Sequence, residues 1–177
     1  MTGWPRRLVA ALLPAHTALV VPVPEAQSAV DRVARTGEQP VAHITLLWPF
    51  RRTLRRRDRD ALKQLAATQP GFAFELRVIA TFPDVVYLAP EPADRFRALI
   101  EALVARWPDQ PPYAGAFTDV VPHLTLRIGD DLSGSERRAV EDLLPITATA
   151  REILVVRPGT RRWRVLYRTP LDAATSK

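Results

Sequence analysis

Two nearly identical tetrapeptides lie 80 residues apart in this chain, His43-Ile-Thr-Leu and His123-Leu-Thr-Leu. The whole sequence contains only three histidines, so ordinary residue frequencies do not explain why two of them share one motif. Each tetrapeptide is apolar enough to form a strand, and each falls in the middle of a similar run of predicted elements. The sequence therefore predicts a duplicated α+β unit built around two matching strands.

Hydrophobic periodicity predicts strand, helix, strand, helix, strand in both halves, with one extra strand at the end. The predicted strands cover residues 19–23, 41–48, 72–81, 85–88, 123–128, 147–156 and 161–169. The predicted helices cover residues 25–35, 58–68, 93–107 and 135–144. Two such halves are expected to pair around a pseudo-twofold axis. The expected fold is bilobal, with two antiparallel sheets lining a central groove and the helices outside.

Length and composition indicate a single folded domain. The chain has 177 residues, 47% of them apolar and 25% charged, which is typical of globular proteins. We expect an N-terminal extension at 1–17, one bilobal domain at 18–171 and a loose tail at 172–177. No uncharged apolar run of about 18 residues is present to span a membrane. The absence of cysteine excludes disulfides, thiol nucleophiles and cysteine-bound metals.

The N-terminus has two arginines before a short apolar run, which loosely resembles a signal peptide. Pro14 and His16 interrupt that run and no A-x-A cleavage site follows. We therefore expect a cytoplasmic protein that has no contact with a membrane, and we expect it to be a monomer.

The charged residues are strongly biased toward arginine. The chain has 25 lysine and arginine residues and 19 acidic residues, which gives a net charge of +6. Lys63 and Lys177 are the two lysines in the sequence, and the other basic residues are arginine. The guanidinium of arginine can donate two hydrogen bonds to the oxygens of one phosphate, so one interpretation of the bias is a phosphate-bearing partner. The other interpretation is that the bias reflects a GC-rich genome. Six arginines lie between Arg51 and Arg59. They either follow an RNA backbone or form a solvated loop and helix start, with Asp58 and Asp60 as partners.

Strand alternation places the polar residues of each motif on one face. His43 and Thr45 point to the same side of their strand. His123, Thr125 and Arg127 share a face of theirs. The opposite, apolar faces are expected to pack under the helices and consist of Ile44, Leu46 and Trp48 in the first strand and Leu124, Leu126 and Ile128 in the second.

Two imidazoles, two hydroxyls and one guanidinium are thereby expected to meet. Imidazole titrates near neutral pH, so one ring can take a proton while the other gives one. Hydroxyl groups and the guanidinium of Arg127 can bind phosphoryl oxygens. This set can hydrolyse a phosphodiester without a metal, and we expect no cofactor. A zinc site of three histidines is disfavoured because nothing places His16 beside the other two. We expect His16 to be a surface or structural residue.

The loop at 108–122 leads directly into the second motif and carries Tyr113 and Phe117. Long loops are often functional, and aromatic side chains can stack on an unpaired base. The loop is therefore either a substrate flap that uses these two rings or a packing segment.

The segments VAHITLLWPF at 41–50 and PPYAGAFTDVVPHLTL at 111–126 resemble the two-histidine phosphoesterase superfamily, which includes 2′-5′ RNA ligase and cyclic phosphodiesterase proteins. The resemblance extends from about residue 18 to about residue 169. It implies that both motifs face a central groove, that His43 and His123 are the catalytic pair, and that Thr45 and Thr125 bind phosphate. It favours His123 as base and His43 as acid, although the similarity of the motifs leaves the roles open.

The function expected from these observations is metal-independent hydrolysis of 2′,3′-cyclic phosphates on RNA ends or nucleotides, with 2′-5′ ligation as the reverse reaction. One alternative is an RNA-binding module without turnover. Another is an enzyme for a cyclic phosphate of a non-RNA metabolite, because the walls around the motifs select the substrate.

Overall fold

The computed structural model describes all residues except 1–15, 37–39, 117–119, 158, 160–162 and 173–177. The strands are β1 (Ala18–Pro22), β2 (His43–Leu47), β3 (Phe72–Phe82), β4 (Val85–Glu91), β5 (Leu124–Ile128), β6 (Ile146–Ala150), β7 (Glu152–Arg157) and β8 (Arg164–Pro170). The helices are α2 (Gln27–Val33), α3 (Arg56–Ala66), α4 (Asp94–Arg106) and α5 (Gly134–Glu141), with short 3₁₀ turns η1 (Pro24–Ala26) and η2 (Pro112–Gly115).

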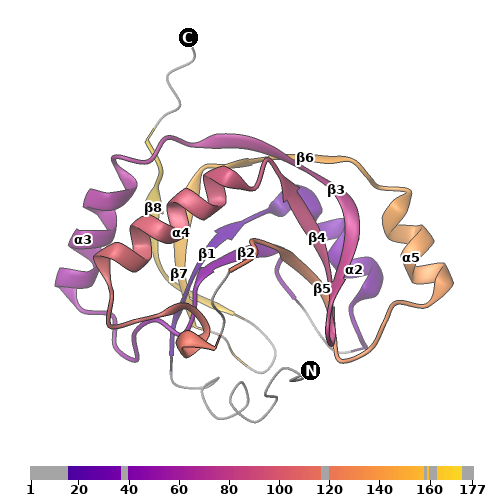
Figure 1. The fold of residues 1–177 in the computed structure, drawn as a ribbon, viewed down its shortest axis with the longest axis horizontal. Helices are drawn as coiled ribbons and strands as arrows, with labels where there is room; N and C mark the ends of the chain where they lie inside the picture. The colour runs from indigo at the N-terminus through magenta and orange to yellow at the C-terminus, as the bar shows by residue number, and fades with distance from the viewer. Residues whose placement is uncertain (1–15, 37–39, 117–119, 158, 160–162, 173–177) are drawn as a thin grey trace.

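All eight of these strands belong to one antiparallel sheet in the order β6-β3-β4-β5-β2-β1-β7-β8 (Figure 1). The two motif strands, β2 and β5, are central neighbours joined by the pair Ile44 and Leu124. The expected α+β class is confirmed. The expectation of two separate sheets is wrong, because the β2–β5 pairing connects the two halves into a single sheet.

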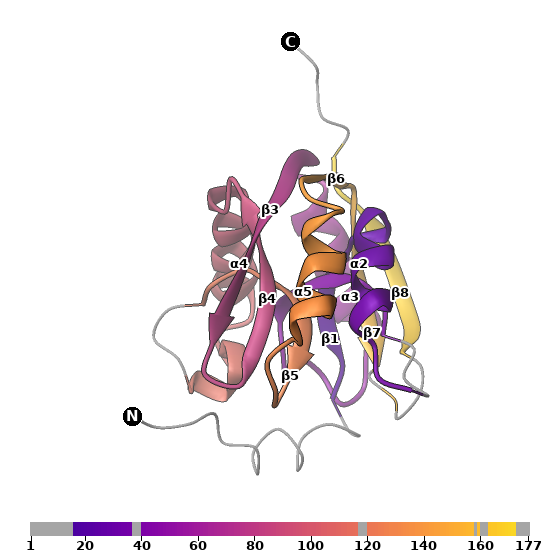
Figure 2. The same cartoon turned by 90° about the vertical axis from the view of Figure 1, so that its right-hand side faces the viewer.

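The sheet is strongly curled. Strand β6 lies at one edge beside β3, whereas β7 lies near the other edge beside β1, yet only Arg151 separates β6 from β7 in the chain. The two edges must therefore approach each other. Figure 2 shows β3 and β4 on one side of the molecule and β7 and β8 on the other. At this approach the backbone N–H of Gly71, just before β3, donates to the carbonyl of Asp172, just after β8, at 2.9 Å.

The helices cover one face of the sheet. Alternate residues of the strands, among them Leu19, Ile44, Leu88, Leu124 and Val155, form one core with the apolar sides of α2, α3, α4 and α5. Figure 1 shows α3 and α4 toward one end of the sheet and α2 and α5 toward the other. Burying these side chains is the main source of stability.

A second, smaller cluster lies on the opposite face. It contains Ala18 and Val20 of β1 and Leu154 and Val156 of β7, and the rings of Trp48 and Trp163 pack against it. The polar residues of the motifs share this face, because their neighbours in sequence are in the main core.

Most predicted elements are confirmed to within a few residues, including the helix at 93–107 and the strands at both motifs. The prediction of one strand at 147–156 is wrong. These residues form two strands, β6 and β7, which pair with different halves of the sheet. Among the described residues no helix is long and apolar enough to cross a bilayer.

Candidate functional site

The pairing of β2 with β5 brings the two motifs together. Ile44 opposes Leu124 in an antiparallel register, and from this register His43 opposes Thr125 while Thr45 opposes His123. Each histidine thus faces the threonine of the other motif, with directly opposite Cβ atoms about 5 Å apart and diagonal ones about 7–8 Å apart. With their Cβ atoms at this diagonal spacing, the two histidines flank a space that a phosphoryl group can enter.

Each histidine is oriented by the same local hydrogen bond. Nδ1 of His43 lies 2.5 Å from the Val41 carbonyl oxygen, and Nδ1 of His123 lies 2.8 Å from that of Val121. A carbonyl only accepts, so Nδ1 carries the hydrogen in both rings. In the neutral rings Nε2 therefore has the lone pair, and it is the atom available to take or return a proton.

Aromatic side chains enclose both imidazoles. The Trp163 ring centroid is 4.2 Å from that of His43. Phe82 and Tyr87 stack on each other with centroids 4.2 Å apart, and both meet His123 edge-on at 5.3 and 5.4 Å. Each ring is thereby held in place by an apolar wall on its own side of the site.

This enclosure lowers the pKa of both histidines. Burial, together with the nearby His123, lowers the pKa of His43 from 6.5 to about 4, although the hydrogen bond to the Val41 carbonyl opposes the shift. Burial also lowers the pKa of His123, again against its carbonyl hydrogen bond. Both rings are consequently neutral at pH 7 in the free protein.

The threonines supply hydroxyl groups beside the imidazoles. Thr45 and Thr125 are half-buried, and within the part of the chain that the structure describes neither hydroxyl has a hydrogen-bond partner. A hydroxyl can donate to a phosphoryl oxygen. The arrangement therefore combines two proton-transfer groups with two donors for an anionic ligand.

A β-bulge occurs in both motif strands at the motif leucine. Between β1 and β2 the pairing steps from Val20–Thr45 to Leu19–Leu47, which leaves Leu46 as the extra residue. Between β4 and β5 it steps from Tyr87–Thr125 to Val86–Arg127, which leaves Leu126 as the extra residue. A bulge interrupts alternation, so the residue after the leucine points to the same side as the leucine.

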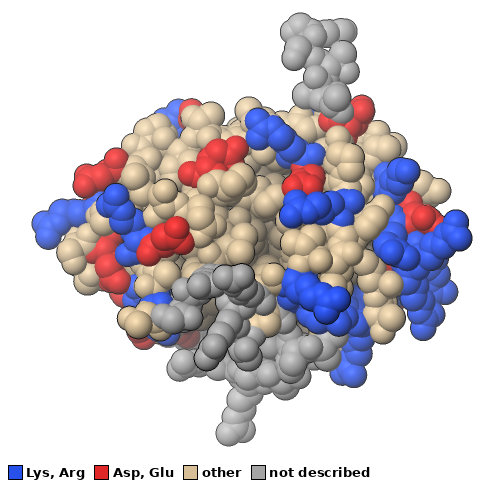
Figure 3. Space-filling view, turned by 180° about the vertical axis from the view of Figure 1, so that it is seen from behind, with Lys and Arg blue, Asp and Glu red and all other residues tan. Residues whose placement is uncertain are grey.

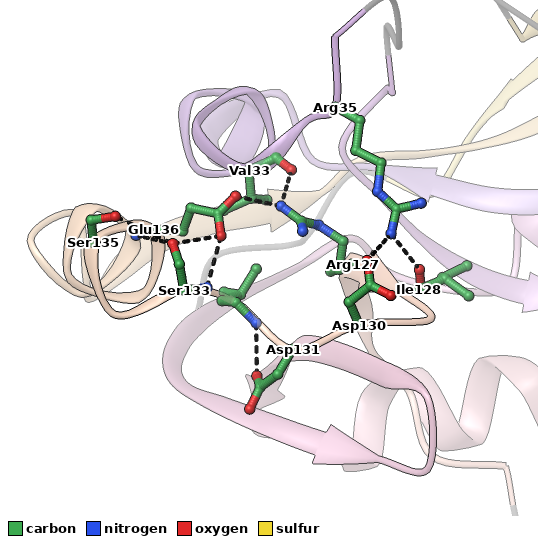
Figure 4. Close-up of polar contacts among 10 residues, drawn as sticks. Val33, Arg35, Arg127, Ile128, Asp130, Asp131, Ser133, Ser135 and Glu136 are labelled. Carbon is green, nitrogen blue, oxygen red and sulfur yellow. Dashed lines mark hydrogen bonds and ion pairs between the residues drawn. The ribbon is translucent and has the colours of Figure 1, made fainter.

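Arg127 lies away from the expected position because of this bulge. Its Nη2 donates to the Val33 carbonyl at 2.7 Å and to Oε1 of Glu136 at 2.6 Å (Figure 4). The guanidinium is thus held between α2 and α5, on the helix side of the sheet. The expectation that Arg127 shares a face with His123 and Thr125 and contacts the phosphoryl group is therefore wrong.

Trp48 is also redirected. Alternation predicts it on the helix side with Leu46, but its ring packs against the small cluster on the motif face. Leu47 takes the buried position instead, at 0% exposure. Trp48 and Trp163 therefore both pack against the small cluster on the motif face, and of the two it is Trp163 that contacts His43.

Tyr113 lies beside Trp48. Its backbone N–H donates to the Trp48 carbonyl at 2.5 Å, and the two ring centroids are 6.2 Å apart. Burial raises the pKa of Tyr113 to about 12, so the phenol is neutral. Phe117 falls outside the described residues. His16 lies before β1, where its Nε2 accepts from Nε of Arg52 at 3.4 Å.

Three aromatic residues of the site were not predicted, namely Trp163, Phe82 and Tyr87. Each is far in sequence from the histidine that it contacts, and only the sheet pairing brings it there. The sequence predicted a strand at 161–169, but it gave no sign of the residue that Trp163 contacts. Within the described ranges no three His, Cys, Asp or Glu side chains are grouped so that they could hold a metal ion.

Comparison with known proteins gives a family match. The family model described as the 2′-5′ RNA ligase superfamily matches residues 15–162. No curated protein matches the sequence.

Several solved structures share the fold. The protein TT0787 of Thermus thermophilus superposes with a TM-score of 0.61 at 20% identity, covering 89% of this chain and 98% of its own. LigT of E. coli complexed with NADP+ superposes with a TM-score of 0.58 at 20% identity, and LigT complexed with 3′-AMP with 0.55 at 18%. Both LigT comparisons cover 90% of this chain and 99% of that one.

Proposed function

Because this chain belongs to the 2′-5′ RNA ligase superfamily, which supports an enzyme of the phosphoesterase or ligase type, we propose that it hydrolyses 2′,3′-cyclic phosphates of RNA ends or nucleotides. The reverse reaction is 2′-5′ ligation. The observation that carries the proposal is the matched pair of imidazoles, each with Nδ1 on a backbone carbonyl and Nε2 available. The LigT structures with 3′-AMP and NADP+ support a nucleotide as ligand.

The reaction needs one proton acceptor and one proton donor. Nε2 of one histidine takes a proton from water as the water oxygen bonds to phosphorus. Nε2–H of the other gives its proton to the ribose oxygen as its bond to phosphorus breaks. The hydroxyls of Thr45 and Thr125 donate to the non-bridging oxygens, which gain charge during attack. None of these steps requires a metal ion.

Burial lowers the pKa of both histidines, so their pKa values do not divide the roles between them. We keep the order that the family resemblance favours, with His123 as base and His43 as acid in hydrolysis. An anionic phosphate between the rings raises the pKa of both and helps to protonate the acid.

The test is turnover of a dinucleotide that ends in a 2′,3′-cyclic phosphate, measured with and without a chelator. We expect activity to persist in the chelator, and His43→Ala and His123→Ala each to lower kcat by at least about 10². His16→Ala is the matched control and should retain activity. Folding of each variant is checked by circular dichroism and Tm.

A phosphodiester with a nitrophenolate leaving group separates the two roles. A good leaving group needs little protonation, so loss of the acid matters less for this substrate. His43→Ala should then recover much of its lost rate, whereas His123→Ala should not. Recovery by His123→Ala alone would reverse the assignment, and near-normal activity of either variant on the dinucleotide would refute the proposed function.

A further inference from the structure

We infer that Tyr87 is a further residue of the site and that its phenol O–H donates, together with the Thr125 hydroxyl, to one non-bridging oxygen of the bound phosphate. The inference rests on the proposed function and adds a third donor to it. It starts from a polar group that the fold does not use. Tyr87 is only 8% exposed, yet its hydroxyl has no hydrogen-bond partner among the residues that the structure describes. Because buried tyrosine hydroxyls are usually paired, this one is available to a ligand.

The sheet register places Tyr87 beside the second motif. Tyr87 pairs with Thr125 across β4 and β5, and directly opposite residues have their Cβ atoms about 5 Å apart. The next residue, Leu88, is in the main core on the helix side, so Tyr87 lies on the motif face. Its ring meets the His123 ring at 5.4 Å between centroids. A phosphate held by His123 and Thr125 therefore lies next to the phenol.

The other half of the sheet has no hydroxyl at the equivalent position. Val20 pairs with Thr45 across β1 and β2, next to the bulge in β2. Tyr87 pairs with Thr125 in the same way, next to the bulge in β5. Val20 is apolar and belongs to the small cluster on the motif face. The phosphate oxygen on the Thr125 side thus has two donors available, whereas the oxygen on the Thr45 side has one.

The phenol of Tyr87 is a fixed and neutral donor. Its ring stacks on that of Phe82 with centroids 4.2 Å apart, and a donor already held in place needs no reordering when charge develops on the phosphate. Burial raises the pKa of the Tyr87 phenol above its ordinary value, so the oxygen keeps its hydrogen at pH 7.

The arginine that alternation predicted at this place does not compete with the phenol. Arg127 is held on the helix side by the Val33 carbonyl and Glu136. Figure 3 shows Lys and Arg side chains gathered toward the side of the molecule where α3 lies. We therefore expect the negative charge of the phosphate to be stabilised by hydroxyl donors, among which Tyr87 is the third.

The experiment removes the hydroxyl and leaves the ring. Tyr87→Phe retains an aromatic ring against Phe82 and His123. Tyr167→Phe is the matched control, because Tyr167 packs against the main core. On the dinucleotide with a 2′,3′-cyclic phosphate, we expect Tyr87→Phe to lower kcat/KM by about 10- to 100-fold, as the loss of a hydrogen bond to a charged group does. Tyr167→Phe should keep the wild-type value.

Sulfur substitution then distinguishes a direct contact from a structural effect. The two diastereomers of the cyclic phosphorothioate each carry sulfur, a weak hydrogen-bond acceptor, in place of one non-bridging oxygen. With one diastereomer Tyr87→Phe should lose little activity relative to the wild type, because the phenol has no good acceptor there. With the other diastereomer the loss should be as large as with oxygen. A tyrosine that only positions His123 would give the same loss with all three substrates.

Near-normal kcat/KM of Tyr87→Phe, or an equal loss with all three substrates, would overturn the inference. A wild type that does not cleave the dinucleotide refutes the proposed function instead. Binding of the dinucleotide with a 3′-phosphate end, measured by calorimetry, still tests Tyr87 in that case, because it requires no turnover. Tyr87→Phe should weaken this binding by about fivefold, and an affinity equal to that of the wild type would overturn the inference.

Discussion

The two histidines depend on their immediate surroundings for their chemistry. A backbone carbonyl two residues earlier selects the tautomer of each ring. An aromatic wall then removes water and lowers the pKa. The wall of His43 is formed by Trp163, which comes from the segment before β8. The protonation of the first motif is therefore controlled by a residue 120 positions away.

Replacing Trp163 tests this control. Trp163→Ala admits water to the His43 ring, and desolvation is the largest cause of its low pKa. We expect the pKa of His43 to rise from about 4 toward 6.5, measured by NMR titration of the ring. Trp163→Phe keeps an apolar ring at the position and should leave the pKa low. A pKa of about 4 in Trp163→Ala would show that other groups exclude the water.

At the level of elements, the two bulges determine which side chains reach the motif face. The bulges at Leu46 and Leu126 occupy equivalent positions in β2 and β5. Each redirects the following residue to the helix side. That residue is Leu47 in one half and Arg127 in the other. The buried Leu47 side chain packs in the main core, and the Arg127 guanidinium contacts α2 and α5, so each joins its motif strand to the helices.

The capping box of α5 supports the Arg127 contact. The side-chain oxygen of Ser133 accepts from the backbone N–H of Glu136, and the Glu136 carboxylate accepts from the backbone N–H of Ser133 at 2.8 Å. The carboxylate also accepts from the Ser133 hydroxyl at 2.8 Å. These two hydrogen bonds from Ser133, together with the one from Arg127, lower the pKa of Glu136 to about 2. The carboxylate is therefore ionised and fixed in place to receive the guanidinium.

Arg127→Met is expected to destabilise the protein by about 2 kcal/mol, because it leaves a carboxylate and the Val33 carbonyl without their charged donor. Urea unfolding measures the loss. The second change in Arg127→Met/Glu136→Gln removes the unpaired charge and should restore part of the stability. The dinucleotide kcat should remain near the wild-type value in both variants. A large fall in kcat with unchanged stability would return Arg127 to the active site.

At the scale of the whole molecule, one curled sheet serves both halves, and the pairing of its two central strands forms the site. Two imidazoles kept from water at this centre make folding sensitive to acid. The unfolded chain binds a proton at each histidine near pH 6.5, whereas folded His43 does so only near pH 4. The unfolded state thus holds more protons between these values, and stability falls as pH decreases through this window.

Thermal unfolding at pH 7 and pH 4.5 tests this dependence. The wild type should have a lower Tm at pH 4.5, and the double variant His43→Gln/His123→Gln should lose less Tm than the wild type over the same interval. Glu136, whose pKa is lowered from 4.5 to about 2 in the folded protein, adds an acid-induced loss of its own near pH 4.5, but this loss is common to both proteins and cancels in the comparison. Identical losses of Tm would show that the histidines do not carry the acid sensitivity.

The sequence by itself was sufficient to predict the α+β class, most element positions and the two motif strands with their histidines and threonines on one face. These features depend on alternation and periodicity, which act between residues close in the chain. Only the tertiary structure decided the single sheet, the division of 147–156 into β6 and β7, the bulges that redirect Arg127 and Trp48, and the contact of Trp163 with His43. Each depends on which distant strand supplies the hydrogen bonds and in which register, and alternation within one strand carries no information about either.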